Sequence, residues 1–569
     1  MPGPTFSRRR LLAGGAAFRA IAAIGGAVFA RRGGNDPASG AGPTATSPED
    51  TSSPTPAPRP RGGALRIAAA ASLSFDTFDA LRTGQPPVVE VLGRTHSRLL
   101  RWTSFSGATL GPDLAARWEQ PEHDLFVLHL DAKARWQERA PLHGRPVSAD
   151  DVAAHFRRAA EGARGRQLPF VPRAADFAAI RRVSAPGGLT VRFELEQPDA
   201  FFAGALAGRF SLVQAPEAVT AFEGRWSEGD PETVVGSGPF IFERRLDDDS
   251  LAFRAFGGSH RPPLLDSLTV SAPGSNDSAR FLAGELDEVL TRDRRDAAAM
   301  RAAMAPGTIE LPRFEDSPII SSMNTAAPPW NNAHLRLALS AALNRGRLAS
   351  RLFGGRAAPA GYLPPAFAGA PTERELLAIP GYGSDPEEDA RQTRALWAAG
   401  GGPALGAVTV DIPSIFDPRY SAGATVTAML NEVLGAGQFR PAVESYTTIA
   451  AKAAAGQYGG GIAAFWFGWG PAFSDPDPAR YLIELFGAQK GASLLSAANA
   501  AAVARLATEF DSARRQAAAH GLAIALAADA GAEVLPWLLQ RSELFRRPGV
   551  QGPPPSAFWD QHLDRALGL

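Results

Sequence analysis

The chain is 569 residues long, far longer than a single hydrophobic core can organise. It should therefore fold as two or three lobes, each with a core of its own. Short strand-like runs alternate with helical segments that carry capping residues, and no internal repeat of solenoid period is present. This pattern predicts α/β or α+β lobes.

Several elements can be placed from local pattern. Val191–Glu196 alternates apolar and charged residues, and Gly187-Gly188 supplies a turn back to a strand at Ile180–Val183. Ser148, followed three residues later by Asp151, predicts the start of a helix. Further strands are expected at Ala64–Ala68, Leu125–Leu130, Phe240–Arg245 and Leu251–Phe256. Further helices are expected after Asn331 or Asn332, from Pro386 to Gly400 with Ser384 or Asp385 as the cap, and over Ala497–Ala530 with an interruption near Gly521.

The N-terminus resembles an export signal. Ser7-Arg8-Arg9-Arg10-Leu11-Leu12 precedes a weakly apolar stretch broken by glycines, which is similar to a Tat signal, and Val28-Phe29-Ala30 is a candidate cleavage site. An uncleaved anchor within residues 1–32 is the alternative. Residues 33–62 are rich in Pro, Ser and Thr, so we expect a disordered linker. Either way, the rest of the chain lies outside the cytoplasm, in the periplasm or cell-envelope space.

Composition excludes several classes of function. The chain has no cysteine, which rules out disulfides, thiol catalysis, thiolate metal sites and lipid attachment through cysteine. Removing the six arginines of residues 1–32 leaves 52 basic against 58 acidic residues, so we expect no nucleic-acid partner. No segment after the N-terminus offers the ~20 apolar residues of a membrane span.

No motif points to a cofactor, a metal or catalysis. Asp247, Asp248 and Asp249 lie between two expected strands, and we interpret them as an acidic hairpin turn because three adjacent carboxylates cannot all face one ion. His123 and His129 could share a strand face, yet no third ligand is near in the sequence. The His-Glu-x-x-His, Gly-x-Ser-x-Gly and phosphate-loop patterns are absent from the sequence. We expect a protein that is not an enzyme.

One aromatic stretch suits the wall of a cavity. Phe465-Trp466-Phe467 predicts a buried strand, and the Gly, Pro, Ser and Asp residues from Gly468 to Pro478 predict an ordered loop. Aromatic side chains beside such a loop suit a partly apolar solute, whereas the alternative is core packing followed by a turn. Trp466 precedes Trp469 by three residues and would face the opposite side of a strand, so we expect it in the core.

Short motifs follow one another along the chain from Phe78 to Arg345. They are Phe78-Asp79-Ala80 with Leu99-Leu100, Gly111-Pro112-Asp113-Leu114-Ala115-Ala116-Arg117-Trp118, Trp136 with Arg145-Pro146-Val147-Ser148-Ala149-Asp150-Asp151-Val152, Val235-Gly236-Ser237-Gly238-Pro239-Phe240, Ala283-Gly284-Glu285-Leu286-Asp287, and Asn324 with Leu335-Arg336-Leu337-Ala338-Leu339 and Leu343-Asn344-Arg345. The series resembles the solute-binding proteins of ABC importers, specifically the oligopeptide- and dipeptide-binding class of family 5.

The resemblance implies an α/β, two-lobed periplasmic-binding-protein fold, type II-like, with a subdomain added to the first lobe. The chain would cross between the lobes at a hinge, and closure of the hinge would enclose the ligand. Carried over to this sequence, the first lobe is 63–108 with 232–318 and 546–569, the added subdomain is 109–231, and the second lobe is 319–545.

The resemblance also implies residues that bind the solute. In peptide-binding relatives a Trp of this strand lines the cleft, and an Asp three residues later pairs with the peptide's α-amino group. Trp469 matches the Trp, but Ala472 stands at the Asp position. An enclosed ammonium without a carboxylate is costly, so binding of free-amine peptides needs another acid, and Asp475 and Asp477 are the nearest. The other expected ligand-binding residues are Tyr446, Asn324, Thr83, Gly84 and Gln85.

The expected function is that of a monomeric, non-catalytic receptor exported through the Tat machinery. It would capture a small, peptide-like solute in an interlobe cleft and deliver it to an ABC permease with its ATPase subunits. Three alternatives remain open at this point: a Tat-exported hydrolase, a binding protein for a metal chelate, an opine or a sugar, and a tethered sensor or adhesion module.

Overall fold

The computed structural model describes residues 62–550 with gaps. The residues left out of this range are 70–72, 74, 105–107, 167, 169–170, 292–293, 315–317, 326, 366, 380–381, 383–384, 415–420, 436, 446–447, 450–451, 453–462, 468–474, 487–495 and 530–533.

The described chain forms two compact units. The N-terminal unit contains residues 62–312, Asp475 and 543–550, and the C-terminal unit lies within 313–472 and 476–542. The chain therefore leaves the N-terminal unit after Pro312, returns to it around Asp475, and returns again after Ser542. Each unit has its own buried apolar core, as expected for a chain of this length.

The N-terminal unit is built on two four-stranded sheets. In the sheet β1-β10-β9-β8, β1 is parallel to β10 and the other neighbours are antiparallel; in the sheet β4-β5-β7-β6, all neighbours are antiparallel. The strands of this unit are β1 (Ala64–Ala68), β2 (Leu100–Ser104), β3 (Thr109–Pro112), β4 (Ala115–Glu122), β5 (Leu125–Leu130), β6 (Ile180–Gly187), β7 (Thr190–Leu195), β8 (Phe240–Arg245), β9 (Leu251–Ala255), β10 (Ser267–Ser271) and β11 (Glu288–Thr291). The next strand, β12 (Ile309–Phe314), crosses the boundary between the units after Pro312.

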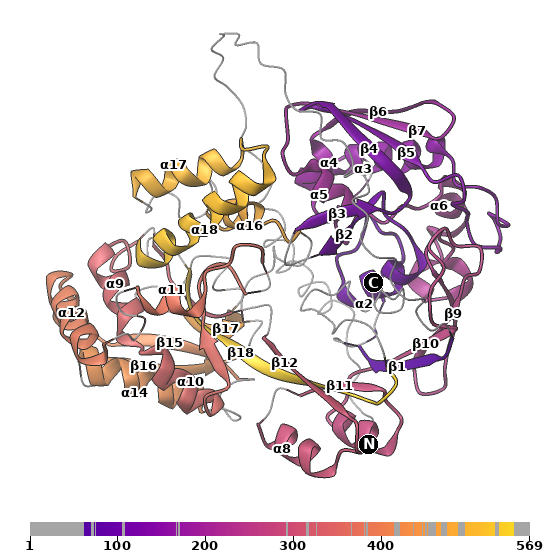
Figure 1. The fold of residues 1–569 in the computed structure, drawn as a ribbon. Helices are drawn as coiled ribbons and strands as arrows, with labels where there is room; N and C mark the ends of the chain where they lie inside the picture. Colours follow the sequence, from indigo (N-terminus) through magenta and orange to yellow (C-terminus); the bar gives the residue numbers. More distant parts are fainter. Residues whose placement is uncertain are drawn as a thin grey trace, which may run out of the picture. The chain divides into compact units, whose positions relative to one another are not determined.

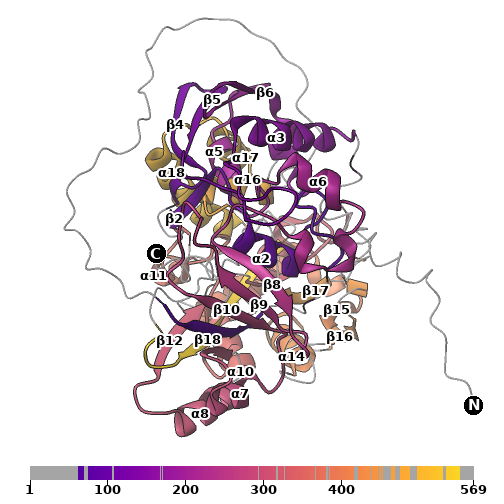
Figure 2. The ribbon, with the colours of Figure 1, turned by 90° about the vertical axis from the view of Figure 1, so that its right-hand side faces the viewer.

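Helices cover these sheets, and α3 lies along β6 and β7 (Figures 1 and 2). Phe156 of α3 packs edge-on against Phe193 of β7, with ring centroids 5.1 Å apart. The helices are α2 (Pro86–Thr95), α3 (Ala149–Ala163), α4 (Ala174–Ala178), α5 (Phe202–Ala207), α6 (Pro216–Phe222), α7 (Asp277–Ala283) and α8 (Arg294–Ala303), with 3-10 turns η2 (Trp226–Glu228) and η3 (Pro231–Thr233).

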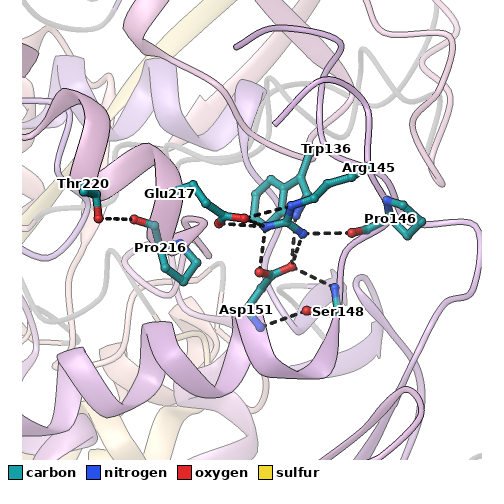
Figure 3. A network of polar contacts seen from close by, with 8 residues as sticks. All are labelled: Trp136, Arg145, Pro146, Ser148, Asp151, Pro216, Glu217 and Thr220. Atoms are coloured by element: carbon teal, nitrogen blue, oxygen red, sulfur yellow. Dashed lines mark hydrogen bonds and ion pairs between the residues drawn. The ribbon is translucent and has the colours of Figure 1, made fainter. Parts of the chain in front are cut away.

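The predicted start of α3 is confirmed, and it anchors a network of charges (Figure 3). Ser148 Oγ accepts from the Asp151 N–H, and an Asp151 carboxylate oxygen accepts from the Ser148 N–H. Arg145 donates to both oxygens of Asp151 at 2.7 and 2.8 Å and also to Glu217 at the start of α6. Burial alone would raise the pKa of Asp151, but the hydrogen bonds from Arg145 and Ser148 hold it below its usual value. The motif thus joins two helices.

The glycines of Val235-Gly236-Ser237-Gly238-Pro239 are required by close packing on the end of α2. A Cβ at Gly236 would lie 2.0 Å from the Thr95 carbonyl oxygen, and one at Gly238 would lie 2.7 Å from the His96 nitrogen. Fully buried Gln137 joins the two segments: its Nε2 donates to the Thr95 carbonyl at 3.3 Å, and its N–H donates to the Gly236 carbonyl at 2.9 Å. No side chain larger than hydrogen fits at either glycine.

The C-terminal unit has a parallel pair, β15-β16, and a sheet in which β18 pairs with β13 and β14 through residues 534–540. The remaining length of β18 pairs with β11 in the N-terminal unit. Helices α9, α12 and α14 pack together near β15 and β16 (Figure 1). The strands are β13 (Ile319–Ser322), β14 (Ala357–Pro359), β15 (Val408–Pro413), β16 (Phe439–Glu444), β17 (Ala463–Phe467) and β18 (Val534–Arg546).

Two helices of this unit begin at caps that the sequence predicts. Asn332 caps α9 and Asp385 caps α12, which ends at Gly400 as predicted. The helices are α9 (Ala333–Ala342), α10 (Arg345–Phe353), α11 (Glu373–Leu377), α12 (Pro386–Ala399), α14 (Ala422–Leu434), α16 (Pro478–Phe486), α17 (Ala497–Leu506) and α18 (Ser512–Asp529), with a 3-10 turn η4 (Gly402–Ala404).

One boundary prediction was wrong. The Ala-rich stretch is broken between Leu506 and Ser512, and Gly521 lies inside α18. Gly521 is exposed and costs a helix only about 1 kcal/mol relative to Ala, which its alanine and leucine neighbours offset. The break occurs where Asp511 accepts a hydrogen bond from the Arg514 N–H and so starts a new helix.

Two buried histidines make the N-terminal unit sensitive to acid. Burial lowers the pKa of His96 to about 3, and burial lowers that of His155 to about 3 with smaller contributions from Arg158 and His96. The unfolded chain, with a histidine pKa of about 6.5, therefore binds protons that the folded state excludes. The contribution of these two histidines to the free energy of unfolding is therefore at its full value above about pH 6.5 and is lost as the pH drops towards 3.

We expect each histidine to lower the free energy of unfolding by up to about 1.4 kcal/mol per pH unit across this window. Urea unfolding between pH 7 and pH 4.5 measures the slope. His155→Gln, which removes one titrating group, should reduce the slope relative to the unsubstituted protein. An unchanged slope would show that His155 does not titrate in this way.

Candidate solute-binding residues

The predicted loop Thr83-Gly84-Gln85 leads directly into α2 of the N-terminal unit. Thr83 is 1% exposed, and its hydroxyl donates to Asp76 at 2.8 Å and accepts from the Gln85 N–H at 3.1 Å. Gly84 and Gln85 are exposed, and the Gln85 side chain makes no capping bond to α2. A solute at this loop would therefore meet Gly84 and Gln85, while Thr83 shapes the loop from beneath.

Buried polar contacts hold this loop in place. Asp79 is fully buried and forms a two-point ion pair with Arg158 of α3, one arm of which is 2.9 Å long. Gln214 accepts from the Ala80 N–H and donates to the Phe78 carbonyl, both at 2.9 Å. The motif Phe78-Asp79-Ala80 is thus a tertiary anchor, and it fixes the backbone that leads to Gly84.

Asp475 belongs to the N-terminal unit. It is 5% exposed, and its carboxylate approaches Gly204 of α5. The space beside it, bordered also by Arg173, Asp176 and Ser211, is about 10 Å³, no larger than one water molecule. A peptide cannot enter this space, so any contact of Asp475 with a solute stays a prediction.

Asp477 is bonded inside the C-terminal unit. One oxygen accepts from Arg515 Nη2 at 2.7 Å and Nε at 3.0 Å, and the other accepts from the Ala479 N–H at 2.9 Å at the start of α16. Both side chains of the ion pair are less than a tenth exposed. This geometry is that of a structural carboxylate, and contact of Asp477 with a solute stays a prediction.

The remaining predicted residues are less constrained by the structure. Asn324 is half-buried just after β13, and its carbonyl accepts from the Ala327 N–H at 3.4 Å. Trp469 and Tyr446 lie outside the described residues, as does Ala472. The predicted strand before Trp469 is confirmed as β17, which pairs with β13.

Sequence reasoning did not single out Lys452. Its ammonium donates to Asp411 of β15 at 3.1 Å and to Glu444 of β16 at 2.6 Å. Burial alone would lower the pKa of Lys452, but the hydrogen bonds to Glu444 and Asp411 raise it above its usual value. The three charges lie toward the carboxyl ends of two parallel strands, where α/β sheets commonly bind ligands, and β15 lies beside β17. Lysine is rare in this chain, and this rarity is the feature of the sequence that could have drawn attention to Lys452.

A larger hollow in the C-terminal unit holds none of the predicted residues. It measures about 470 Å³ and lies among α9, α10, α12 and α14. Its walls are charged, and Arg347 forms a two-point ion pair with Glu432 with both distances 3.0 Å. The side chains that line it carry as many positive as negative charges: Arg347, Arg391 and Arg394 are cationic, and Glu387, Asp389 and Glu432 are anionic. We regard it as a solvated charged groove.

In the part of the chain that the structure describes, no helix has both the length and the apolar character needed to cross a membrane. The same residues contain no group of three or more His, Asp or Glu side chains arranged to hold a metal ion.

Comparison with known proteins decides the family. The family model described as bacterial extracellular solute-binding proteins, family 5 Middle, matches residues 109–490. The chain belongs to this family. The resemblance drawn from the ordered motifs is therefore confirmed. Family 5 membership assigns the chain to a class of proteins that bind solutes outside the cytoplasm.

One relative is the probable di/tripeptide-binding protein 5 of Pseudomonas aeruginosa (strain UCBPP-PA14). It is 27% identical over 355 residues, which cover 58% of this chain and 62% of the relative. The match thus spans less than two thirds of that relative's length.

Solved structures share the fold. DppA from Helicobacter pylori, in complex with the peptide STSA, matches with a TM-score of 0.68 at 18% identity, over 90% of this chain and 98% of that chain. AgaA from A. tumefaciens R10, in complex with agropinic acid, matches with a TM-score of 0.63 at 18% identity, over 89% and 98% of the two chains. The predicted α/β periplasmic-binding-protein fold with two lobes is confirmed.

Asp477→Ala should destabilise the C-terminal unit, because it leaves Arg515 buried without its carboxylate and removes the cap of α16. We expect a loss of about 3–5 kcal/mol in the free energy of unfolding, measured by urea titration. Asp511→Ala, at the exposed start of α18, is the matched control and should cost far less. If the two substitutions cost the same, the Asp477–Arg515 pair does not have the structural role assigned to it.

Proposed function

We propose that this chain is an extracytoplasmic receptor that captures a peptide-like solute in an interlobe cleft and delivers it to an ABC permease. The observation that carries the proposal is the family 5 match over residues 109–490. The di/tripeptide-binding relative and the peptide complex of DppA support a peptide-like solute. Export through the Tat machinery and a monomeric, non-catalytic state are parts of the same proposal.

The proposed solute contacts come from both units. Trp469 and Tyr446 supply aromatic surface, Asn324 supplies an amide, and Gly84 and Gln85 supply exposed backbone and a second amide. Amide and aromatic side chains suit a peptide, whose own amides need hydrogen-bond partners once water is removed.

Ala472 shapes the expected specificity. It provides no carboxylate for a peptide's α-ammonium, while Asp475 is buried in the N-terminal unit and the Asp477 carboxylate is bound by Arg515. The Asp411–Lys452–Glu444 triad carries a net charge of −1. If the amino end of the solute is cationic, Asp411 and Glu444 supply the acidic groups that Ala472 lacks. AgaA, which has the same fold, is bound to agropinic acid, so the fold leaves a non-peptide solute as the second candidate.

Thermal unfolding of the purified protein against di- to hexapeptides, each with a free and an N-acetylated amine, tests the proposal. A solute at 100 times its dissociation constant stabilises the folded state by about 2.7 kcal/mol. We expect the free and the acetylated form of the best peptide to stabilise the folded protein equally, since Ala472 has no carboxylate to bind the free amine. Stabilisation by free-amine peptides alone would point to Asp411 and Glu444, and no shift with any peptide would contradict a peptide solute.

Trp469→Ala tests whether the proposed aromatic contact binds the peptide. It should abolish the peptide-induced shift while leaving the solute-free midpoint within about 2 °C of the unsubstituted protein, because a solute-lining side chain contributes little to the core. Product analysis of the same samples by mass spectrometry should find the peptides intact, whereas cleaved peptide would favour a hydrolase.

A further inference from the structure

His155 of α3 is a buried histidine that accepts a hydrogen bond from the chain just before α6. It is 3% exposed, and its Nδ1 accepts from the Gln214 N–H at 3.3 Å. A protonated Nδ1 cannot accept, so this hydrogen bond exists only while the ring is neutral. The other ring nitrogen, Nε2, is buried and has no hydrogen-bond partner among the described residues. The surroundings therefore offer no acceptor to either N–H of a protonated ring.

Gln214 carries this contact to the loop before α2, which consists of residues Phe78–Gln85. Gln214 is 2% exposed, and its side-chain amide accepts from the Ala80 N–H and donates to the Phe78 carbonyl, both at 2.9 Å. One amide makes both bonds, so a displacement of Gln214 breaks them together. The loop ends at the exposed residues Gly84 and Gln85, which the proposed function assigns to the solute.

Arg158 holds the same loop from the same face of α3. It lies three residues after His155, pairs with both carboxylate oxygens of Asp79, and lies 3.9 Å from Glu223 at the end of α6. Glu223 in turn pairs with Arg82 of the loop at 3.1 Å. All these residues belong to the N-terminal unit. Two residues of α3 thus hold one loop, His155 through a neutral ring and Arg158 through its charge.

The charges around His155 oppose its protonation. Burial has the largest effect in lowering the pKa of His155, and the positive charges of Arg158 and of His96, just after α2, lower it further. The loop contributes the carboxylate of Asp79 and α6 contributes that of Glu223, but both pair with Arg158. A ring that leaves this environment regains a pKa of about 6.5, so acid favours arrangements in which the contact with Gln214 is broken.

We propose that His155 is a positioning residue for solute capture: the neutral ring holds Gln214 against the loop before α2, and protonation of the ring loosens this loop and weakens solute binding. Because His155 is buried, it acts through Gln214 and does not touch the solute. The affinity part of this inference rests on the proposed function, whereas the holding of the loop does not.

Hydrogen–deuterium exchange of the intact, solute-free protein tests the holding of the loop. The amides of Ala80, Leu81 and Arg82 are hydrogen-bonded and report on it. Between pH 6.5 and pH 4.5 their exchange, corrected for the intrinsic effect of pH, should quicken by up to about tenfold per pH unit. It should be faster throughout than exchange in the β4-β5-β7-β6 sheet, because the loop opens without unfolding the unit. Loop amides that do not quicken, or that exchange only together with the sheet, would overturn the proposal.

Two substitutions separate the acceptor of His155 from its proton. His155→Asn places an amide oxygen near the position of Nδ1 and cannot titrate, so the loop should lose its acid response. His155→Leu removes the acceptor, so the loop amides should exchange about tenfold faster already at pH 7. His129→Asn is the matched control, because His129 of β5 bonds only Glu119 and Thr190, and it should keep the acid response. A His155→Asn loop that still quickens in acid would contradict the role of this proton.

Gln214→Met keeps the test decisive if His155→Leu does not fold. It removes the bonds to Phe78 and Ala80 and leaves the backbone N–H that His155 accepts. The loop amides should exchange faster at pH 7, and their acid response should vanish, because the side chain that transmits it is gone. An acid response that persists in Gln214→Met would show that His155 does not act through Gln214.

The affinity part uses the peptide that most stabilises the unsubstituted protein in the thermal panel. Isothermal titration should show binding about tenfold weaker at pH 4.5 than at pH 7, because a loosened loop lowers the fraction of protein competent to bind. In His155→Asn the two affinities should agree within about twofold. An equal loss of affinity in both proteins would overturn the positioning role. If no peptide binds, the proposed function fails and the affinity part fails with it, while exchange still decides whether His155 holds the loop.

Discussion

The close contact between the backbone of Gly236–Gly238 and the end of α2 is the constraint on which the N-terminal unit depends. At 2.0 Å from the Thr95 carbonyl oxygen, even a methyl group at Gly236 is excluded. Gln137 uses its side-chain amide to bind both segments, and buried His96 lies at the same junction. At its other end, α2 starts directly after its N-cap residue Gln85. The contact at Thr95 therefore also fixes the helix that follows the exposed residues Gly84 and Gln85.

Elements whose cause is local could be predicted from sequence. The capping box of Ser148 and Asp151, the glycine turn between β6 and β7, and the α12 boundaries at Asp385 and Gly400 each follow from residues within one turn of the chain. Gly521 shows the limit of this reasoning, because the side chains around a helical glycine outweigh its propensity.

The roles of the acidic residues needed tertiary structure. Asp475 and Asp477 are two residues apart and look alike in sequence, yet their environments differ because the chain changes unit between them. The partners Gly204 and Arg515 are 271 and 38 residues away from Asp475 and Asp477, respectively, and no local pattern connects them. The Asp411–Lys452–Glu444 triad likewise forms only when β15 and β16 pair in parallel.

The same fold accommodates different solutes, so the identity of the cargo depends on a few side chains. Ala472 offers no acidic group to a solute, while the aromatic and amide groups proposed for the cleft suit any flat, polar solute. Family membership therefore determines the class of function, and the chemistry of these positions determines what is carried.

Native mass spectrometry of the protein purified from the cells that make it, with the solute released by mild denaturation and identified, tests the central claim most directly. A receptor for a peptide-like solute should carry one such molecule per chain, recovered chemically intact. Two results would contradict the account: hydrolysis products in place of an intact solute, or protein that carries no solute even when the cells grow on peptides.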